Sequence, residues 1–168
     1  VTGLPNRALL SDRLEQEVAR ARRATSGFAL LMFDLDGFKE VNDRWGHAAG
    51  DRVLAIVGAR ARECLRASDT LGRLGGDEFM AILPEATRQG AMAVGGKIVD
   101  ALALPYPLER GQAMLSASVG VAMYPADGAD GEALQRAADA VLYAAKREGK
   151  NRVRGTPAVE TPTIAAAA

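Results

Sequence analysis

Apolar residues recur at intervals of three or four in several stretches of the chain, the pattern of helices that bury one face. The first stripe follows the segment 1–7 and consists of Leu10, Leu14, Val18 and Ala21. The second follows Gly46 and consists of Val53, Leu54, Val57, Ala61 and Cys64. The third precedes Gly149 and consists of Leu134, Ala138, Val141, Leu142 and Ala145. A further helix is predicted over 87–104, because Pro105 and Pro107 close a stretch of helical composition.

Strand patterns separate these helices. The apolar run 28–33 predicts a buried strand that ends at Asp34-Leu35-Asp36-Gly37, and the polar residues up to Gly46 are expected to form a loop. Segments 70–74 and 78–83 flank a Gly-Gly pair, which predicts a β-hairpin. A strand over 114–123 would place Leu115, Ala117, Val119 and Val121 on one face, and 151–154 predicts a short last strand.

This order of elements indicates an α/β or α+β fold with one mixed central sheet covered by helices. The 168 residues, 48% of them hydrophobic, suit one domain over 1–154. From residue 155 the chain is rich in Thr, Pro and Ala without a period, which predicts a disordered tail or linker over 155–168.

Charge and composition exclude several kinds of site. The 21 basic and 21 acidic residues give a formal net charge of +0, which argues against a broad cationic face for nucleic acid. The single Cys64 and single His47 exclude an internal disulfide, a multi-thiolate metal site and any site with two imidazoles. The longest apolar run is far shorter than the ~20 residues of a membrane span, so a cytoplasmic location without membrane contact is expected.

Two acidic clusters fall at strand ends: Asp34 and Asp36 close the first strand, and Asp77 and Glu78 follow the hairpin turn. If the two strands are neighbours, these carboxylates converge. Ligands that are all oxygen suit Mg²⁺ or Mn²⁺ together with substrate phosphates, and two such ions support phosphoryl or nucleotidyl transfer. Taken alone, each cluster is better explained by a turn or a helix cap.

Other polar residues also have ordinary explanations. Lys146 and Lys150 would by default be solvated cations near a helix end, and Arg66 with Asp69 would be a surface ion pair. His47 would cap the following helix. Trp45 would be a half-buried aromatic residue.

The sequence Arg73-Leu-Gly-Gly-Asp-Glu-Phe79 resembles the signature of the GGDEF family of diguanylate cyclases. Further motifs of that family stand in the same order along 2–154. They are Thr2-Gly-Leu-Pro-Asn-Arg7, Phe33-Asp-Leu-Asp-Gly-Phe-Lys39, Asn42-Asp43, Gly46-His47, Gly50-Asp51, Ser118-Val-Gly-Val121, Ala138-Asp139, Tyr143, Ala145-Lys146 and Gly149-Lys-Asn151. The opening motif lacks its leading acidic residue, which suggests that the chain starts inside it, behind a sensory domain.

The resemblance implies a sheet related to the palm of nucleotidyl cyclases and polymerases, and a role for each matching residue. Asp34, Asp77 and the carbonyl of Leu35 would bind Mg²⁺ or Mn²⁺, two ions per GTP. Asn42 and Asp51 would hydrogen-bond guanine.

The remaining roles concern the phosphates and the reaction itself. Lys39 and the amides around Phe38 would face the GTP phosphates, and Lys146 would add positive charge there. The turn Gly75-Gly76 and Lys150 would also contact the substrate. The family commonly has arginine at the position of Lys150. Glu78 would either assist deprotonation of the attacking 3′-hydroxyl or contact a metal. The resemblance thus implies Asp77, Glu78 and Lys39 as the catalytic residues.

The implied reaction joins two GTP into cyclic di-GMP and two pyrophosphates. Because the product has two-fold symmetry, two identical half-sites in a homodimer can build it. Arg66 and Asp69 resemble the inhibitory product site of many family members, with Lys97 near a second basic position. The alternatives are a GTP or cyclic di-GMP receptor module that regulates an attached domain, and a pure dimerisation module, which leaves the carboxylates unexplained.

Overall fold

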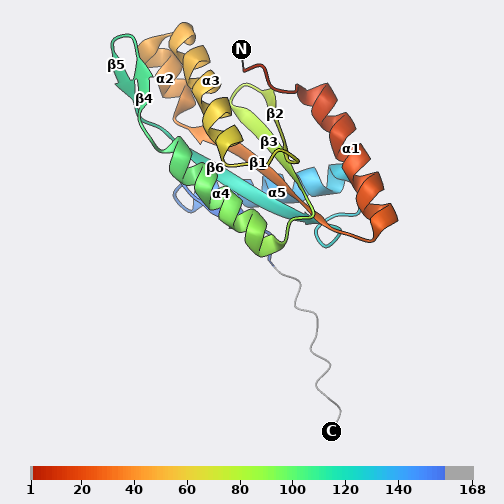
Figure 1. The fold of residues 1–168 in the computed structure, drawn as a ribbon. Coiled ribbons are helices and arrows are strands. Elements are labelled where there is room, and N and C mark those ends of the chain that lie inside the picture. The colour runs from red at the N-terminus through yellow and green to blue at the C-terminus, as the bar shows by residue number, and fades with distance from the viewer. Residues whose placement is uncertain (1, 158–168) are drawn as a thin grey trace.

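The computed structural model describes residues 2–157, and these form a five-stranded sheet covered by helices on both faces (Figure 1). The strands lie in the order β2-β3-β1-β6-β7, antiparallel throughout except for the parallel pair β6 and β7. The elements are α1 (Arg7–Ala24), β1 (Phe28–Asp36), α2 (Phe38–Trp45), α3 (His47–Glu63), β2 (Thr70–Gly75), β3 (Glu78–Pro84), α4 (Arg88–Leu102), β4 (Tyr106–Leu108), β5 (Gly111–Ala113), β6 (Ser116–Tyr124), α5 (Gly131–Arg147) and β7 (Val153–Gly155). The mixed sheet predicted from the sequence is confirmed.

The alternation of side chains along β1 creates two cores. Residues Ala29, Leu31, Phe33 and Leu35 belong to the larger cluster, which includes the apolar stripes of α3 and α4. Residues Phe28, Leu30 and Met32 belong to the second cluster, which includes those of α1 and α5. Successive side chains of a strand point to opposite faces, so Asp34 and Asp36 continue the row that faces α1 and α5.

Two strand glycines let helices lie directly on the sheet. A Cβ at Gly120 in β6 would stand 2.3 Å from the carbonyl oxygen of Ala138 in α5. A Cβ at Gly72 in β2 would stand 2.5 Å from Leu10 of α1. The close contact at Gly120 fixes the height of α5 above the sheet and thereby the position of Lys146 farther along that helix.

The region 37–46 differs from the predicted loop, because it contains the helix α2. Only Val41 of this helix is buried, so its sequence shows no apolar stripe. The helix lies between Gly37, with φ of 90°, and Gly46, with φ of 87°. His47 is the first residue of α3 and is exposed, so it is not the cap expected from the sequence; Gly46 occupies that position. Trp45 is half-buried, as expected.

Two other boundaries also differ from the sequence analysis. The prolines 105 and 107 end α4 as predicted, but the segment after them folds into the hairpin β4–β5, which the sequence analysis did not include. The last strand extends to Gly155, and the amide of Thr156 donates to the Val121 carbonyl at 3.1 Å. The rest of the predicted tail, 158–168, lies outside the described residues. Among residues 2–157, no helix has the length and apolar character that crossing a membrane requires.

Candidate active site

The sheet register brings the two acidic clusters together. Asp34 in β1 is the Cα partner of Glu78 in β3, so the convergence predicted from neighbouring strands is confirmed. The ladder between β1 and β3 ends at this pair, whereas the ladder between β1 and β6 continues through Leu35 to Asp36. Leu35 therefore extends beyond the β3 ladder with its side chain in the larger core, and Asp77 follows in the hairpin turn.

The Gly75-Gly76 turn has a conformation that favours glycine at both positions. Its φ angles are 147° at Gly75 and 52° at Gly76, and both residues are exposed. Arg73 reinforces the turn, because its Nε donates to the Gly76 carbonyl at 2.8 Å. Asp77 is half-buried and Glu78 is exposed. The turn thus presents an open backbone surface immediately before the two carboxylates.

Lys146 of α5 neutralises part of this acidic region. Its Nζ lies 2.7 Å from Oδ1 of Asp34 and 3.5 Å from Oδ1 of Asp36. Burial lowers the pKa of Lys146, but hydrogen bonding and charge from Asp34 and Asp36 outweigh burial, and the net shift is upward. Lys146 is therefore a part of the carboxylate cluster and not the freely solvated cation of the ordinary explanation.

The carboxyl of Asp34 has an unusual environment. Burial raises its pKa to about 6 from 3.8 against the opposing effect of Lys146, and the negative charges of Asp77 and Asp36 raise it further. Asp36 and Asp77 are thus both close enough to repel Asp34, and the ammonium of Lys146 lies between Asp34 and Asp36. The cluster has an excess of negative charge that a cation would relieve.

Asp36 has a structural role that the sequence analysis did not assign. Its side chain is 5% exposed and accepts hydrogen bonds from Ser116 Oγ at 2.8 Å, from Ser118 Oγ at 3.0 Å and from the backbone amide of Asn151 at 3.2 Å. The signal in the sequence was two serines at alternate positions of a strand that is otherwise apolar.

The start of α2 points its first amides toward the end of β1. Gly37 occupies the N-cap position and has no side chain to satisfy them. Phe38 packs against the larger core, and Lys39 is exposed beside it. An anion at this helix start would meet both the backbone amides and a lysine.

Asn42 and Asp51, the predicted guanine-binding pair, lie on adjacent helices. A Cβ at Gly50 would stand 1.9 Å from Asn42 Oδ1, so the Asn42 side chain rests directly on the backbone of α3. Asp51 is the next residue of α3 and is exposed. The absence of a side chain at Gly50 thus leaves room for the Asn42 carboxamide against the turn of α3 that carries Asp51.

Lys150 lies in the loop that joins α5 to β7. It is exposed and has φ of 64°, and its amide donates to the Ala145 carbonyl at 3.0 Å. The Asn151 amide that follows binds Asp36. Lys150 is therefore held near the acidic cluster by its backbone.

Arg66 and Asp69 lie at the opposite end of the hairpin from the Gly-Gly turn, just before β2. The Asp69 side chain is 1% exposed and accepts from the Arg66 amide at 2.8 Å, whereas the Arg66 side chain is 61% exposed. Arg66 Nη2 also donates to the Pro84 carbonyl at 2.9 Å. This is a built turn with a buried carboxylate, unlike the surface ion pair of the ordinary explanation. Burial raises the pKa of Cys64, two residues before Arg66, and the positive charge of Lys97 acts against this increase, so Lys97 lies near Cys64.

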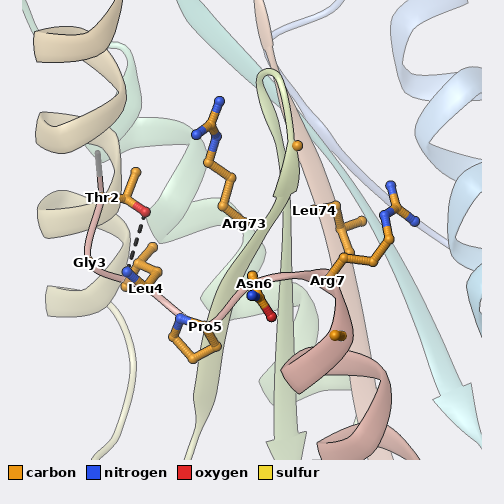
Figure 2. A pocket seen from close by; sticks show the side chains of 10 residues that line it. Thr2, Gly3, Leu4, Pro5, Asn6, Arg7, Arg73 and Leu74 are labelled. Atoms are coloured by element: carbon orange, nitrogen blue, oxygen red, sulfur yellow. Dashed lines mark hydrogen bonds between the residues drawn. The ribbon is translucent and has the colours of Figure 1, made fainter.

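A cleft of about 600 Å³ borders the hairpin turn on its N-terminal side (Figure 2). It lies between the segment 2–8 and residues 73–75, and the Arg73 amide donates to the Pro5 carbonyl at 3.0 Å. In this view Arg7 and Arg73 lie on either side of the hairpin. The opening motif is therefore joined to β2 just before the Gly-Gly turn, with the cleft between them.

The donor set fits a hard divalent cation. Within residues 2–157 there is no group of three or more His, Cys, Asp or Glu side chains with the geometry of a complete metal site. Mg²⁺ does not need one, because it usually takes one or two carboxylates plus water and substrate phosphates. Asp34 and Asp77 supply that number, and the uncompensated charge around Asp34 favours a cation there.

The sheet, the carboxylates at a strand end and hairpin turn, and the adjacent helix start define a palm domain of the nucleotidyl cyclase type. A family model described as "Diguanylate cyclase, GGDEF domain" matches residues 1–152. The chain belongs to the GGDEF family.

Named relatives agree with this assignment. The chain is 46% identical over 151 residues to the bifunctional diguanylate cyclase/cyclic di-GMP phosphodiesterase MucR of Pseudomonas aeruginosa, an alignment that covers 90% of this chain and 22% of MucR. It thus spans about a fifth of that relative. Some other relatives are named cyclic di-GMP phosphodiesterases.

Solved structures show the same fold. The GGDEF domain of TpbB from P. aeruginosa superposes with a TM-score of 0.90 at 39% identity, covering 94% of this chain and 99% of that one. The GGDEF domain of DgcB from Caulobacter crescentus, solved in complex with c-di-GMP, has a TM-score of 0.85 at 29% identity, with 92% of each chain covered.

Proposed function

We propose that this domain is a diguanylate cyclase that condenses two GTP into cyclic di-GMP and two pyrophosphates. The observation that carries the proposal is the pairing of Asp34 with Glu78 across β1 and β3, which joins the two acidic clusters beside the Gly-Gly turn. Family membership and the relatives named diguanylate cyclases support it.

In this proposal Asp34, Asp77 and the Leu35 carbonyl hold Mg²⁺ or Mn²⁺, two ions for each GTP. The metal, when bound, supplies charge neutralisation on the phosphates and lowers the pKa of the attacking hydroxyl. Glu78 is exposed on the same side of the sheet as Asp34 and either accepts the proton of the 3′-hydroxyl or completes the metal contacts.

The other residues bind and orient GTP. The amides at the start of α2 around Phe38, together with Lys39, receive the β- and γ-phosphates, and Lys146 and Lys150 add charge from the far side. The exposed glycines 75 and 76 let the substrate approach the backbone. Asn42 and Asp51 read the guanine edge, as their adjacent positions on α2 and α3 allow.

The symmetry of the product leads us to propose a homodimer as the working species, with one GTP in each half-site. Specific activity should then rise with protein concentration and with a dimerising domain fused before Val1. Specific activity that is flat over a wide dilution series, from protein that is monomeric throughout, would argue against the dimer.

We further propose that Arg66 and Asp69, with Lys97 nearby, form a product-binding site for feedback inhibition. The exposed guanidinium of Arg66 can bind a phosphate and stack on a purine. Product bound there would hold the domains in an arrangement in which the two half-sites cannot meet. We also propose that a sensory domain precedes this domain in the full-length protein and that the domain works in the cytoplasm.

A receptor without catalysis is the second candidate, and the relatives named phosphodiesterases favour it. The full set of Asp34, Asp77 and Glu78 favours the enzyme, because a receptor does not need the metal carboxylates. Incubation with GTP and Mg²⁺, followed by separation of the nucleotides, distinguishes the two. A cyclase forms cyclic di-GMP and pyrophosphate, whereas a receptor leaves GTP unchanged.

A further inference from the structure

The acidic cluster contains two carboxylates of different accessibility that share one ammonium. Asp36 is 5% exposed, Asp34 is 16% exposed and Lys146, which bridges them, is 30% exposed. The lysine is therefore the group with most freedom to move, and the carboxylate of Asp36 is the most firmly held.

The partners of Asp36 explain why it stays in place. Its Oδ2 accepts from Ser116, Ser118 and the Asn151 amide, and its Oδ1 lies within 3.0 Å of Ser118 Oγ. The two serines lie on β6 and are fixed by the sheet, and the Asn151 amide comes from the loop between α5 and β7. With its lone pairs occupied in this way, Asp36 is a poor ligand for an incoming metal.

Asp34 has the opposite surroundings. Its close cationic partner is Lys146, 2.7 Å away, at the strand end next to Asp77. A divalent cation that binds Asp34 through Oδ1 competes with the ammonium for that oxygen, because the Lys146 Nζ lies 2.7 Å from it.

We infer that Lys146 is an exchangeable counter-cation of Asp34 and that Asp36 is the positioning residue that retains it. When a divalent cation binds Asp34, the ammonium moves off that carboxylate and stays beside Asp36, facing the substrate side of the cluster. This inference rests on the proposed function, in which Asp34 is a metal carboxylate. It assigns Asp36 no contact with the metal or the substrate.

The test measures Mn²⁺ affinity by electron paramagnetic resonance, without nucleotide, in the parent and in Lys146→Met. Removal of the competing ammonium should raise Mn²⁺ affinity about tenfold, the scale of one charge-assisted hydrogen bond. Lys150→Met is the matched control, because it removes one positive charge from the same region without a contact to Asp34; it should raise affinity less than about threefold. Equal gains in the two variants would overturn the inference.

Asp36→Asn tests the anchor through a double-mutant cycle with Lys146→Met. In the parent the substitution should lower Mn²⁺ affinity about fivefold, because the ammonium then relies on Asp34 alone. In the Lys146→Met background it should change affinity less than about twofold. An equal loss in both backgrounds would show that Asp36 acts only as a negative charge and would overturn its role.

Two controls separate the possible failures. Thermal unfolding of each variant reports whether the Ser116 and Ser118 network survives, and Ser118→Ala, which weakens the same anchor, replaces Asp36→Asn if that variant does not fold. GTP turnover by the parent is measured separately. A parent that makes cyclic di-GMP but shows equal gains in the two lysine variants refutes the inference alone, whereas a parent that makes none refutes the proposed function.

Discussion

Asp34 in β1 and Glu78 in β3 are direct partners across the central sheet. The pairing places a half-buried carboxyl and an exposed one on the same side of adjacent strands, at the end where the Gly75-Gly76 turn leaves the sheet. Groups on paired strands hold their relative positions better than groups on loops. The candidate site is therefore built mainly on the sheet, and α2, α3 and α5 bring the remaining groups to its edge.

Gly50→Ala should weaken GTP binding about tenfold with little effect on folding. The new Cβ would lie 1.9 Å from Asn42 Oδ1, which is the end of a side chain and can swing away. Asn42 would then leave the guanine-binding position, while alanine favours the helix by about 1 kcal/mol relative to glycine. Calorimetry with a GTP analogue that does not react, together with thermal unfolding, measures both effects.

Gly96→Ala is the control for that substitution, because nothing lies within 4 Å of a Cβ at Gly96 in α4. It should raise the unfolding temperature and leave GTP affinity unchanged. If both variants bind the analogue as tightly as the parent, Asn42 does not read the base.

Gly120→Ala should lower the free energy of unfolding by about 2 kcal/mol or more. Its Cβ would lie 2.3 Å from the Ala138 carbonyl oxygen and 2.7 Å from the Leu142 amide, both backbone atoms of α5. The helix must therefore shift away from β6 and carry Lys146 with it. Urea unfolding measures the loss, and a stability equal to the parent would show that α5 can move at no penalty.

The pKa of Asp34 predicts a specific dependence of stability on pH in metal-free protein. The pKa of the carboxyl is about 6 in the folded protein, compared with 3.8 ordinarily. Between these two pH values the folded state therefore holds a proton that the unfolded state has lost. The free energy of unfolding of the parent should therefore fall, relative to Asp34→Asn, as pH rises from about 4 to about 6, by at most about 3 kcal/mol.

Chemical unfolding of both proteins with a chelator present, at pH steps from 4 to 8, measures this difference. It should level off above about pH 7. A difference that is constant or grows in favour of the parent over this range would mean that partial burial and neighbouring carboxylates do not raise the pKa of Asp34.

Arg66→Ala should raise the final yield of cyclic di-GMP without changing the initial rate, since the proposed inhibitory site is separated from Asp77 by the length of the hairpin. Full progress curves with excess GTP measure this. Thermal unfolding should accompany them, because Arg66 also donates to Pro84 and Asp69. Superimposable curves, with no product binding to the parent by calorimetry, would leave Arg66 and Asp69 with a structural role only.

The long periodic stretches were predictable from the sequence because burial on one face leaves a regular signal. The stripe of Leu10, Leu14, Val18 and Ala21 is buried along its whole length. In α5 the prediction is right for Leu134, Ala138, Leu142 and Ala145, and Val141 is only half-buried. The hairpin was predictable because the Gly-Gly pair stands between two strand patterns.

The missed elements are those with little burial of their own. Helix α2 buries only Val41, and the strands of the β4–β5 hairpin have three residues each, too few for a period. The role of Asp36 depends on Ser116 and Ser118, which are far away in sequence and become neighbours only through the β1–β6 register. The family resemblance assigned Asp34 as a metal carboxylate and gave no role to Asp36, so the hydrogen bonds of Asp36 could be found only in the structure.

The most direct test of the cyclase assignment compares the parent, Asp77→Ala and Asp100→Ala in GTP with Mg²⁺, with cyclic di-GMP separated and quantified. Asp100 is an exposed acidic residue of α4, so its loss controls for net charge. Asp77→Ala should lose about 100-fold or more of the parent's rate while unfolding at the parent's temperature, and Asp100→Ala should keep that rate. Equal rates of product formation by the parent and Asp77→Ala would contradict the assignment.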